Sequence, residues 1–194
     1  MYIPKHFAES RPDVLHDFIE KHSLAAIVTS TAAGLTANHL PVLLDRQTET
    51  LIGHVARANP MHIDMIPGSE ALAIFTGFDH YVSPSWYPSK QEHGRVVPTW
   101  NYAVVHAHGV LNFFDDADRL RGIVERLTRT HEAQFAEPWS VSDAPPDYID
   151  GLLRAIVGLE LKISRLEGKW KNSQNRPEAD RAGVAAALKA DRPL

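Results

Sequence analysis

The chain has 194 residues, of which 44% are hydrophobic and 23% charged, so its length and composition predict a single globular domain covering residues 1–194. Its net charge of -4 argues against a broad electropositive surface for nucleic acid, and the absence of cysteine excludes disulfides, thiolate catalysis and cysteine-ligated metal. There is no apolar leader and no apolar run long enough to cross a bilayer, so we expect a cytoplasmic protein without membrane contact.

After a helix that begins near Pro12, short β-rich segments are separated by Gly, Pro and polar turns. The last segment alternates apolar and polar residues, which is typical of a half-buried strand. Six such strands with few parallel crossovers predict a mainly β fold with flanking helices, built as a closed or nearly closed antiparallel barrel. The predicted strands are Leu24–Ser30, Thr36–Leu44, Leu51–Ala56, Ala71–Phe78, Val104–Phe114 and Val157–Ser164.

Three helices are expected around the last strand. One is capped by Asp115 or Asp116 and packs on the barrel, and a shorter one begins at Pro146. An Ala-rich C-terminal helix covers residues 177–190. Its few apolar anchors, chiefly Val184 and Leu188, leave two alternatives, contact with a neighbouring subunit or fraying. We expect a homodimer, because a twofold partner could cover this apolar surface.

Aromatic residues gather in a proline-rich segment between the fourth and fifth strands, Ser83–Tyr102. Long irregular connections with rigid amphipathic aromatics are usually lids or ligand walls, so Trp86, Trp100 and Asn101 are candidate ligand contacts. The alternative is a surface loop whose Trp side chains fold back onto the core.

The third predicted strand ends at Arg57, and Asn59-Pro60 has the residue types of a helix cap and first helical position. Free helix amides beside an Arg fork would suit a phosphate monoester. The alternative is a solvated Arg next to an ordinary helix start.

The chain contains 11 histidines. His39 and His54 lie on adjacent predicted strands that could bring both to one pocket near Arg57, although each could also be a hydrogen-bonded structural residue. His106 and His108 share one face of a strand, but no carboxylate is evident beside them. We therefore predict no metal site, and expect hydrogen bonding across the sheet or exposure instead.

After the last predicted strand, residues 169–176 form a dense run of hydrogen-bond donors with Trp170 as their only large apolar side chain. Such a run suits an anionic ligand or a subunit interface. A solvated turn before the last helix is the alternative.

Six short motifs occur in order along the chain. They are Met1-Tyr2-Ile3-Pro4, Asn38-His39-Leu40-Pro41, Gly53-His54-Val55-Ala56-Arg57-Ala58-Asn59-Pro60, Ser83-Pro84-Ser85-Trp86-Tyr87, Val97-Pro98-Thr99-Trp100-Asn101-Tyr102 and Ser173-Gln174-Asn175-Arg176. With these motifs the chain resembles, along nearly its whole length, the PaiB-like proteins, the FMN-binding negative transcriptional regulators of bacteria. The resemblance implies a split barrel like that of pyridoxamine-phosphate oxidases and flavin reductases, and a homodimer with flavin pockets at the subunit interface.

By position, the resemblance implies that the strand ending in Arg57 and Asn59 holds the FMN phosphate. It also implies that His39, Leu40 and Pro41 line the edge of the isoalloxazine ring and that Trp86 and Trp100 wall or cover it. The terminal segment would reach the pocket or the dimer partner, and its residues are Ser173, Gln174, Asn175 and Arg176. One departure is Asn172, where the family pattern leads us to expect an apolar residue.

Three functions compete. The first is an FMN-binding regulator of the PaiB type, with DNA or a regulatory protein as its partner. An acidic chain without a recognisable recognition helix should bind DNA weakly and with strong salt sensitivity. The second is a flavin-dependent oxidoreductase, similar to flavin reductases, that acts on a small substrate or nicotinamide cofactor. The third is haem binding or haem breakdown, with histidines as ligands.

Overall fold

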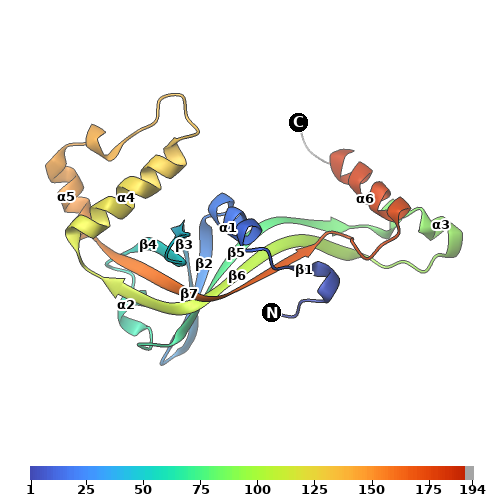
Figure 1. The fold of residues 1–194 in the computed structure, drawn as a ribbon, viewed down its shortest axis with the longest axis horizontal. Helices are drawn as coiled ribbons and strands as arrows, with labels where there is room; N and C mark the ends of the chain where they lie inside the picture. The colour runs from blue at the N-terminus through green and yellow to red at the C-terminus, as the bar shows by residue number, and fades with distance from the viewer. Residues whose placement is uncertain (191–194) are drawn as a thin grey trace.

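The computed structural model describes residues 1–190, which form one antiparallel sheet of seven strands with helices around it (Figure 1). The sheet order is β1-β7-β4-β3-β2-β5-β6, and an additional pairing of β6 with β7 closes six strands into a ring. This confirms the predicted six-stranded barrel, to which β1 adds a short seventh strand beside β7. The strands are β1 Ala8–Glu9, β2 Leu24–Thr31, β3 Gly34–Asp45, β4 Thr50–Ala56, β5 Glu70–Val82, β6 Thr99–Phe114 and β7 Ile156–Lys171.

Three strands are longer than the sequence predicts and continue beyond the barrel as an arm, which extends to the right in Figure 1. The additional residues, 79–82 of β5, 99–103 of β6 and 165–171 of β7, make up the strands of this arm. The irregular connection predicted over Ser83–Tyr102 is therefore shorter than expected. The tip of the arm holds η2 Pro84–Trp86 and α3 Ser89–His93.

Two β-bulges explain why the predicted strands end too early. The register shifts between Thr76 and Asp79 on β5, and again at His108 and Gly109 where β6 faces β7. An extra residue in one strand breaks the period of two on which the prediction depends. The backbone ladder continues past each bulge, so the strands go on where their apolar pattern stops.

In Figure 1, α4 and α5 lie at one end of the molecule and α6 lies with α3 at the other, with α1 between the two ends. Asp116, not Asp115, caps α4, because its Oδ1 accepts a hydrogen bond from the Arg119 amide at 2.7 Å. Within residues 1–190, no helix combines the length and apolar character needed to cross a membrane. The helices are η1 Lys5–Phe7, α1 Pro12–Lys21, α2 Met61–Asp64, α4 Ala117–Glu132, η3 Val141–Asp143, α5 Pro146–Arg154 and α6 Glu178–Ala190.

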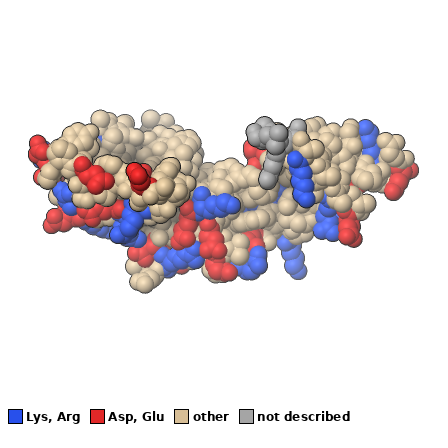
Figure 2. Space-filling model, turned by 90° about the horizontal axis from the view of Figure 1, so that it is seen from above, with Lys and Arg blue, Asp and Glu red and all other residues tan. Residues whose placement is uncertain are grey.

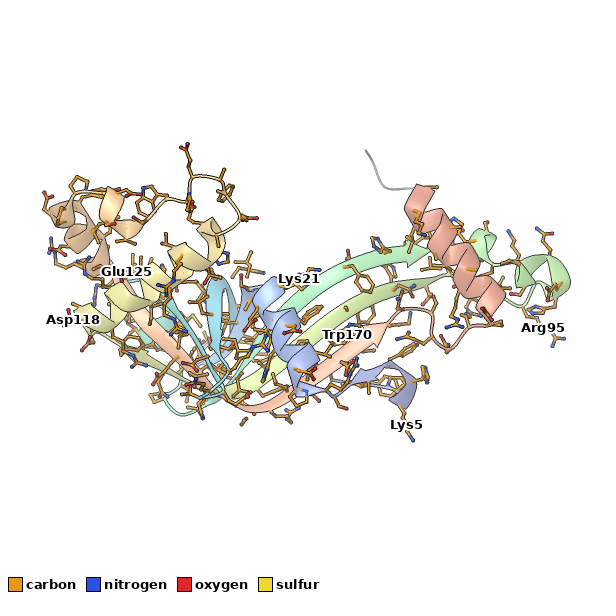
Figure 3. The ribbon with its side chains drawn as sticks, turned by 45° about the horizontal axis from the view of Figure 1, so that its top comes forward. Lys5, Lys21, Arg95, Asp118, Glu125 and Trp170 are labelled. Atoms are coloured by element: carbon orange, nitrogen blue, oxygen red, sulfur yellow. The ribbon has the colours of Figure 1, made fainter. Side chains whose placement is uncertain are left out.

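The main core fills the barrel with side chains such as Ile27, Phe75 and Leu159, all fully buried, and α1 covers one side of it. Where the arm leaves the barrel, Phe18 of α1 packs on Trp170 of β7 with ring centroids 5.0 Å apart (Figure 3). The contact between α1 and β7 braces the base of the arm.

The C-terminal helix packs on the arm of its own chain. Val184 shares a small core with Val82 and Tyr87, and the buried Asp180 carboxylate accepts hydrogen bonds from the Ser89 amide at 3.1 Å and hydroxyl at 2.7 Å. Contact with a neighbouring subunit and fraying were the two expectations for this helix. The structure anchors the helix within its own chain, which argues against fraying, and contact with a neighbouring subunit stays a prediction.

The bulge between β6 and β7 requires glycine at position 109. A Cβ added there would collide with the backbone oxygen of Lys162, and a backbone atom cannot move aside cheaply. We expect Gly109→Ala to lower the free energy of unfolding by about 1–3 kcal/mol, the range of an overpacked site. Urea denaturation measures this change, provided that the dependence of the unfolding free energy on urea concentration is the same for both proteins.

Gly122 in α4 is the matched control, because a Cβ there meets nothing within 4 Å. Gly122→Ala should stabilise the protein by about 0.5–1 kcal/mol, since alanine restricts the unfolded chain and favours the helix. Equal effects of the two substitutions would show that the bulge tolerates a side chain.

Candidate functional site

The middle of β3 and the last residues of β4 place three of the predicted ligand residues on one outer face of the barrel. Leu40 and Val55 contribute to the barrel core, so the alternation of each strand turns His39, Pro41 and His54 outward. His39 and Pro41 are exposed, and His54 is half-buried. We call these three residues the β3–β4 face.

His54 carries an unsatisfied polar atom. Its Nδ1 is buried and has no hydrogen-bond partner among the described residues, and burial lowers the pKa of the imidazole. The ring is therefore neutral near pH 7, and can donate or accept a hydrogen bond depending on its tautomer. The Phe114 ring lies over Gly158, which pairs with His54, and the Arg119 guanidinium covers that ring 3.9 Å from its centroid. This combination fits a planar ligand with polar edges, such as a flavin ring.

Arg57 does not offer the free guanidinium fork that the sequence predicts. Its two Nη atoms donate to both carboxylate oxygens of Asp115 at 2.9 and 2.7 Å, and Nε and Nη2 also donate to the backbone oxygens of Arg154 and Ile156. The pair lowers the pKa of Asp115 and raises that of Arg57. Asp115 reaches Arg57 because β6, which ends at Phe114, is separated from β4 only by β7.

The predicted helix-start amides are also largely used within the chain. Asn59 Oδ1 accepts from the Met61 amide at 2.9 Å, and the Ile63 and Asp64 amides donate to the Pro60 oxygen, each at 2.9 Å. The helix α2 has only four residues, shorter than the sequence suggested. Sequence reasoning missed the partner of Asn59, whose Nδ2 donates to Asn38 Oδ1 at 2.7 Å, although Asn38 stands in the same motif as His39.

A hollow of about 500 Å³ lies beside Arg57, between the start of α4 and the end of α5. Acidic and basic side chains line it in equal number. They are Arg57, Asp115, Asp118, Arg121, Asp150 and Arg154. The hollow has room for a phosphate, but Asp115 competes with any anion for the Arg57 fork.

The other predicted ligand residues lie in the arm. Trp100 is 53% exposed and packs edge-on against Tyr81, whereas Trp86 is half-buried against the tip core. Asn101 is buried and bonds to the Ser173 hydroxyl at 3.0 Å, which shows a structural use for both.

The terminal segment of the arm folds into its own contacts. The Gln174 side chain bonds to the Trp170 carbonyl, Arg176 stacks over Tyr87 at 4.8 Å, and Asn175 is exposed. Asn172 is also exposed, so its polar side chain is accommodated. Residues 169–171 belong to β7, which corrects the prediction that they follow the last strand.

A second hollow, of about 510 Å³, lies between this segment and α6. Its charged and titratable lining is basic only, with His80, Arg181 and Lys189 beside polar Asn172 and Gln174. Its charge suits an anion better than that of the hollow beside Arg57.

The predicted ligand residues therefore form two groups that do not meet within one chain. One group lies on the barrel near β4 and α2, and the other lies at the far end of the arm near α3 and α6 (Figure 1). A single site containing both would need a second copy of the chain.

His106 and His108 are close to a carboxylate, contrary to the sequence expectation. Glu167 of β7 pairs with His106 across the ladder, and its Oε2 lies 3.1 Å from Nε2 of His108. The carboxylate was missed because β7 was predicted to end before Glu167.

Comparison with known proteins places the chain in a family. The family model described as "Putative FMN-binding domain" matches residues 1–165. An uncharacterised protein of Emericella nidulans is 31% identical over 226 residues, covering 97% of this chain and 90% of the relative. The "Protease synthase and sporulation protein PAI 2" of Bacillus subtilis is 29% identical over 190 residues, covering 97% of this chain and 89% of its own.

Solved structures share the fold at low identity. A conserved hypothetical protein of Mycobacterium tuberculosis superposes with a TM-score of 0.64 and 9% identity, over 92% of this chain and 95% of that one. The FAD and haem binding protein of Mycobacterium smegmatis gives a TM-score of 0.61 and 16% identity, over 92% of this chain and 79% of that one. The match over residues 1–165 shows that the chain belongs to the FMN-binding domain family that this model describes, and its split-barrel fold agrees with the PaiB-like resemblance of its motifs.

Proposed function

We propose that the protein is a homodimeric FMN-binding protein in which each flavin lies between the barrel of one subunit and the arm of the other. Family membership supports a flavin cofactor. The observation that carries the dimeric site is the separation of the predicted ligand residues into two groups at opposite ends of the chain. A twofold axis brings each arm of a dimer toward the other barrel, so both groups can serve one ligand.

On the barrel side, the isoalloxazine ring lies on the β3–β4 face. The exposed Pro41 offers apolar surface, and the half-buried, neutral His54 imidazole faces the ring edge. When bound, a flavin supplies one- and two-electron redox chemistry, and the protein supplies its position and surroundings.

The phosphate lies beside Arg57 and Asn59. The adjoining hollow has room for it, and Arg57 can bind it by exchanging its bonds to Asp115 for bonds to phosphate oxygens. A terminal monoester fits this exchange better than the bridged diphosphate of FAD, which supports FMN over FAD.

On the arm side, the exposed Trp100 covers the ring of the flavin bound to the partner. Its edge-on contact with Tyr81 holds the indole in place on the strand, and more than half of its surface is free for a ligand. Trp86 supports this wall from the tip core.

Redox turnover is the activity that this arrangement favours, with small-molecule or nicotinamide substrates. Transcriptional regulation, which the resemblance implies, is the second candidate. In the view of Figure 2, acidic and basic side chains alternate along the molecule without a continuous basic stripe, in keeping with the net charge of -4. A direct role at DNA would need a more basic surface.

The phosphate contact is tested by comparing FMN with riboflavin. Arg57→Ala should weaken FMN binding about 10- to 100-fold and leave riboflavin nearly unchanged, because only FMN carries the phosphate. Asp115→Asn should strengthen FMN binding relative to riboflavin binding, since it frees the Arg57 guanidinium group from its ion pair. Fluorescence titration measures all four affinities, and circular dichroism checks that each variant is folded.

Arg181→Ala in the basic hollow of the arm is the matched control, and FMN affinity should not change. If this variant loses the preference for FMN and Arg57→Ala keeps it, the phosphate lies in the arm and Arg57 is structural. If Arg57→Ala and Asp115→Asn each weaken FMN and riboflavin binding by the same factor, the Arg57–Asp115 ion pair has a purely structural role.

The shared site is tested by mixing two defective subunits. His54→Ala and Trp100→Ala should each weaken flavin binding as homodimers. Heterodimers formed by unfolding and refolding the two variants together should regain one tight site, because one barrel and the opposing arm are then both intact. If the heterodimers regain no tight site, His54 and Trp100 act on a flavin bound within one chain. If light scattering shows a monomer, a flavin site between two subunits is excluded.

Turnover and DNA affinity separate the two functions. Reduction of bound flavin by NADH or NADPH should proceed with kcat on the order of 1–1000 per second, the ordinary range for enzymes. DNA binding by the same preparation should be weak and disappear near physiological salt, because nonspecific contacts depend on counterion release. Tight, salt-resistant binding to one DNA sequence would favour the regulator.

A further inference from the structure

The outer face of β6 and β7 brings two imidazoles and a carboxylate together. His106 and His108 are two residues apart on β6, so both side chains point to the same side, and Glu167 lies directly opposite His106 on β7. One ligand atom from each residue lies within 4.8 Å of the other two. The cluster is sheltered, since only 12% of the His108 side chain and 18% of the Glu167 side chain are exposed.

The neighbours of this cluster orient its members. Glu70 of β5 lies on the other side of His108, with its Oε2 3.8 Å from Nδ1, while His108 Nε2 faces Glu167. At 3.8 Å this contact is longer than a hydrogen bond, and a small shift of the exposed Glu70 side chain would let it accept from Nδ1, the arrangement that fixes ring orientation in metal sites. Arg165 holds Glu167 by Oε1 at 2.9 Å, which leaves Oε2 directed at His108.

We propose that His106, His108 and Glu167 form a Zn²⁺ site. Two neutral imidazoles and one carboxylate are a ligand set that Zn²⁺ accepts, and three protein ligands leave a fourth tetrahedral position for water or another ligand. The present separation of His108 Nε2 and Glu167 Oε2, 3.1 Å, is close to the spacing of two ligands around a tetrahedral ion.

One cation already occupies part of this space. The amino group of Met1 lies 3.1 Å from the same Oε2 of Glu167, and a bound metal would displace it. The site thus has a competing partner for its carboxylate. Zn²⁺ exceeds that partner in charge and forms coordinate bonds to both imidazoles as well as to the carboxylate.

Cobalt substitution tests the site on the full chain. One equivalent of Co²⁺ should bind and give the visible absorption bands of a four-coordinate ion, and Zn²⁺ should displace it. His106→Gln, His108→Gln and Glu167→Gln should each weaken Zn²⁺ binding at least about 100-fold, and Glu70→Gln should weaken it about 10-fold as an orienting residue. His131→Gln, which alters an exposed histidine on α4, should leave the affinity unchanged.

Thermal melts separate loss of the site from loss of the fold. Zn²⁺ should raise the melting temperature of the wild-type protein and of His131→Gln, but not of the three ligand variants, because only a native-state site stabilises by mass action. Each metal-free variant must melt cooperatively for its titration to count, and Glu167→Gln, which keeps the side-chain shape, is the variant most certain to do so. Unchanged Zn²⁺ affinity in Glu167→Gln and His108→Gln, or the absence of a one-equivalent site in the wild type, would overturn the proposal.

Discussion

The antiparallel ladder between β6 and β7 supports both halves of the molecule. At one end it pairs Phe114 with Gly158 and closes the barrel, and at the other it pairs Tyr102 with Lys171 in the arm. Without it the sheet would have two open edges, whose backbone groups would need other partners. Because the same two strands close the barrel and build the arm, the position of the arm relative to the β3–β4 face depends on this ladder.

A second constraint acts at the barrel end near α4. The Arg57 side chain joins four segments, since it bonds to Asp115 after β6 and to two carbonyls where α5 leads into β7. The side chains involved are exposed, so the pair alone contributes little to stability. Its value lies in geometry, because it fixes the end of β4 against the start of α4 and so shapes the hollow beside it.

Local patterns in the sequence were sufficient for the barrel and insufficient for the contacts between distant segments. Alternation located six strands and their inward faces, from which a common face for His39 and His54 follows. The pairing of Arg57 with Asp115 joins residues 58 positions apart in sequence and has no local signal. Likewise, Glu167 could be placed beside His106 only after the extension of β7 was known. The arm was missed because two β-bulges break the alternation of apolar residues on which the prediction depends.

The bulge at His108 and Gly109 has a consequence for insertions and deletions in β7. In the barrel half of the strand the odd-numbered Leu161 and Ile163 face the core, whereas in the arm half the even-numbered Leu166 and Trp170 do. The extra residue, Ser164, therefore lets odd-numbered residues face the core before the bulge and even-numbered residues face it after the bulge. Deleting Ser164 would make the ladder regular, with Arg165 still opposite His108 and Leu166 still facing the core, so this position can lose one residue without reversing the faces of β7. A one-residue deletion in a regular part of the strand reverses them.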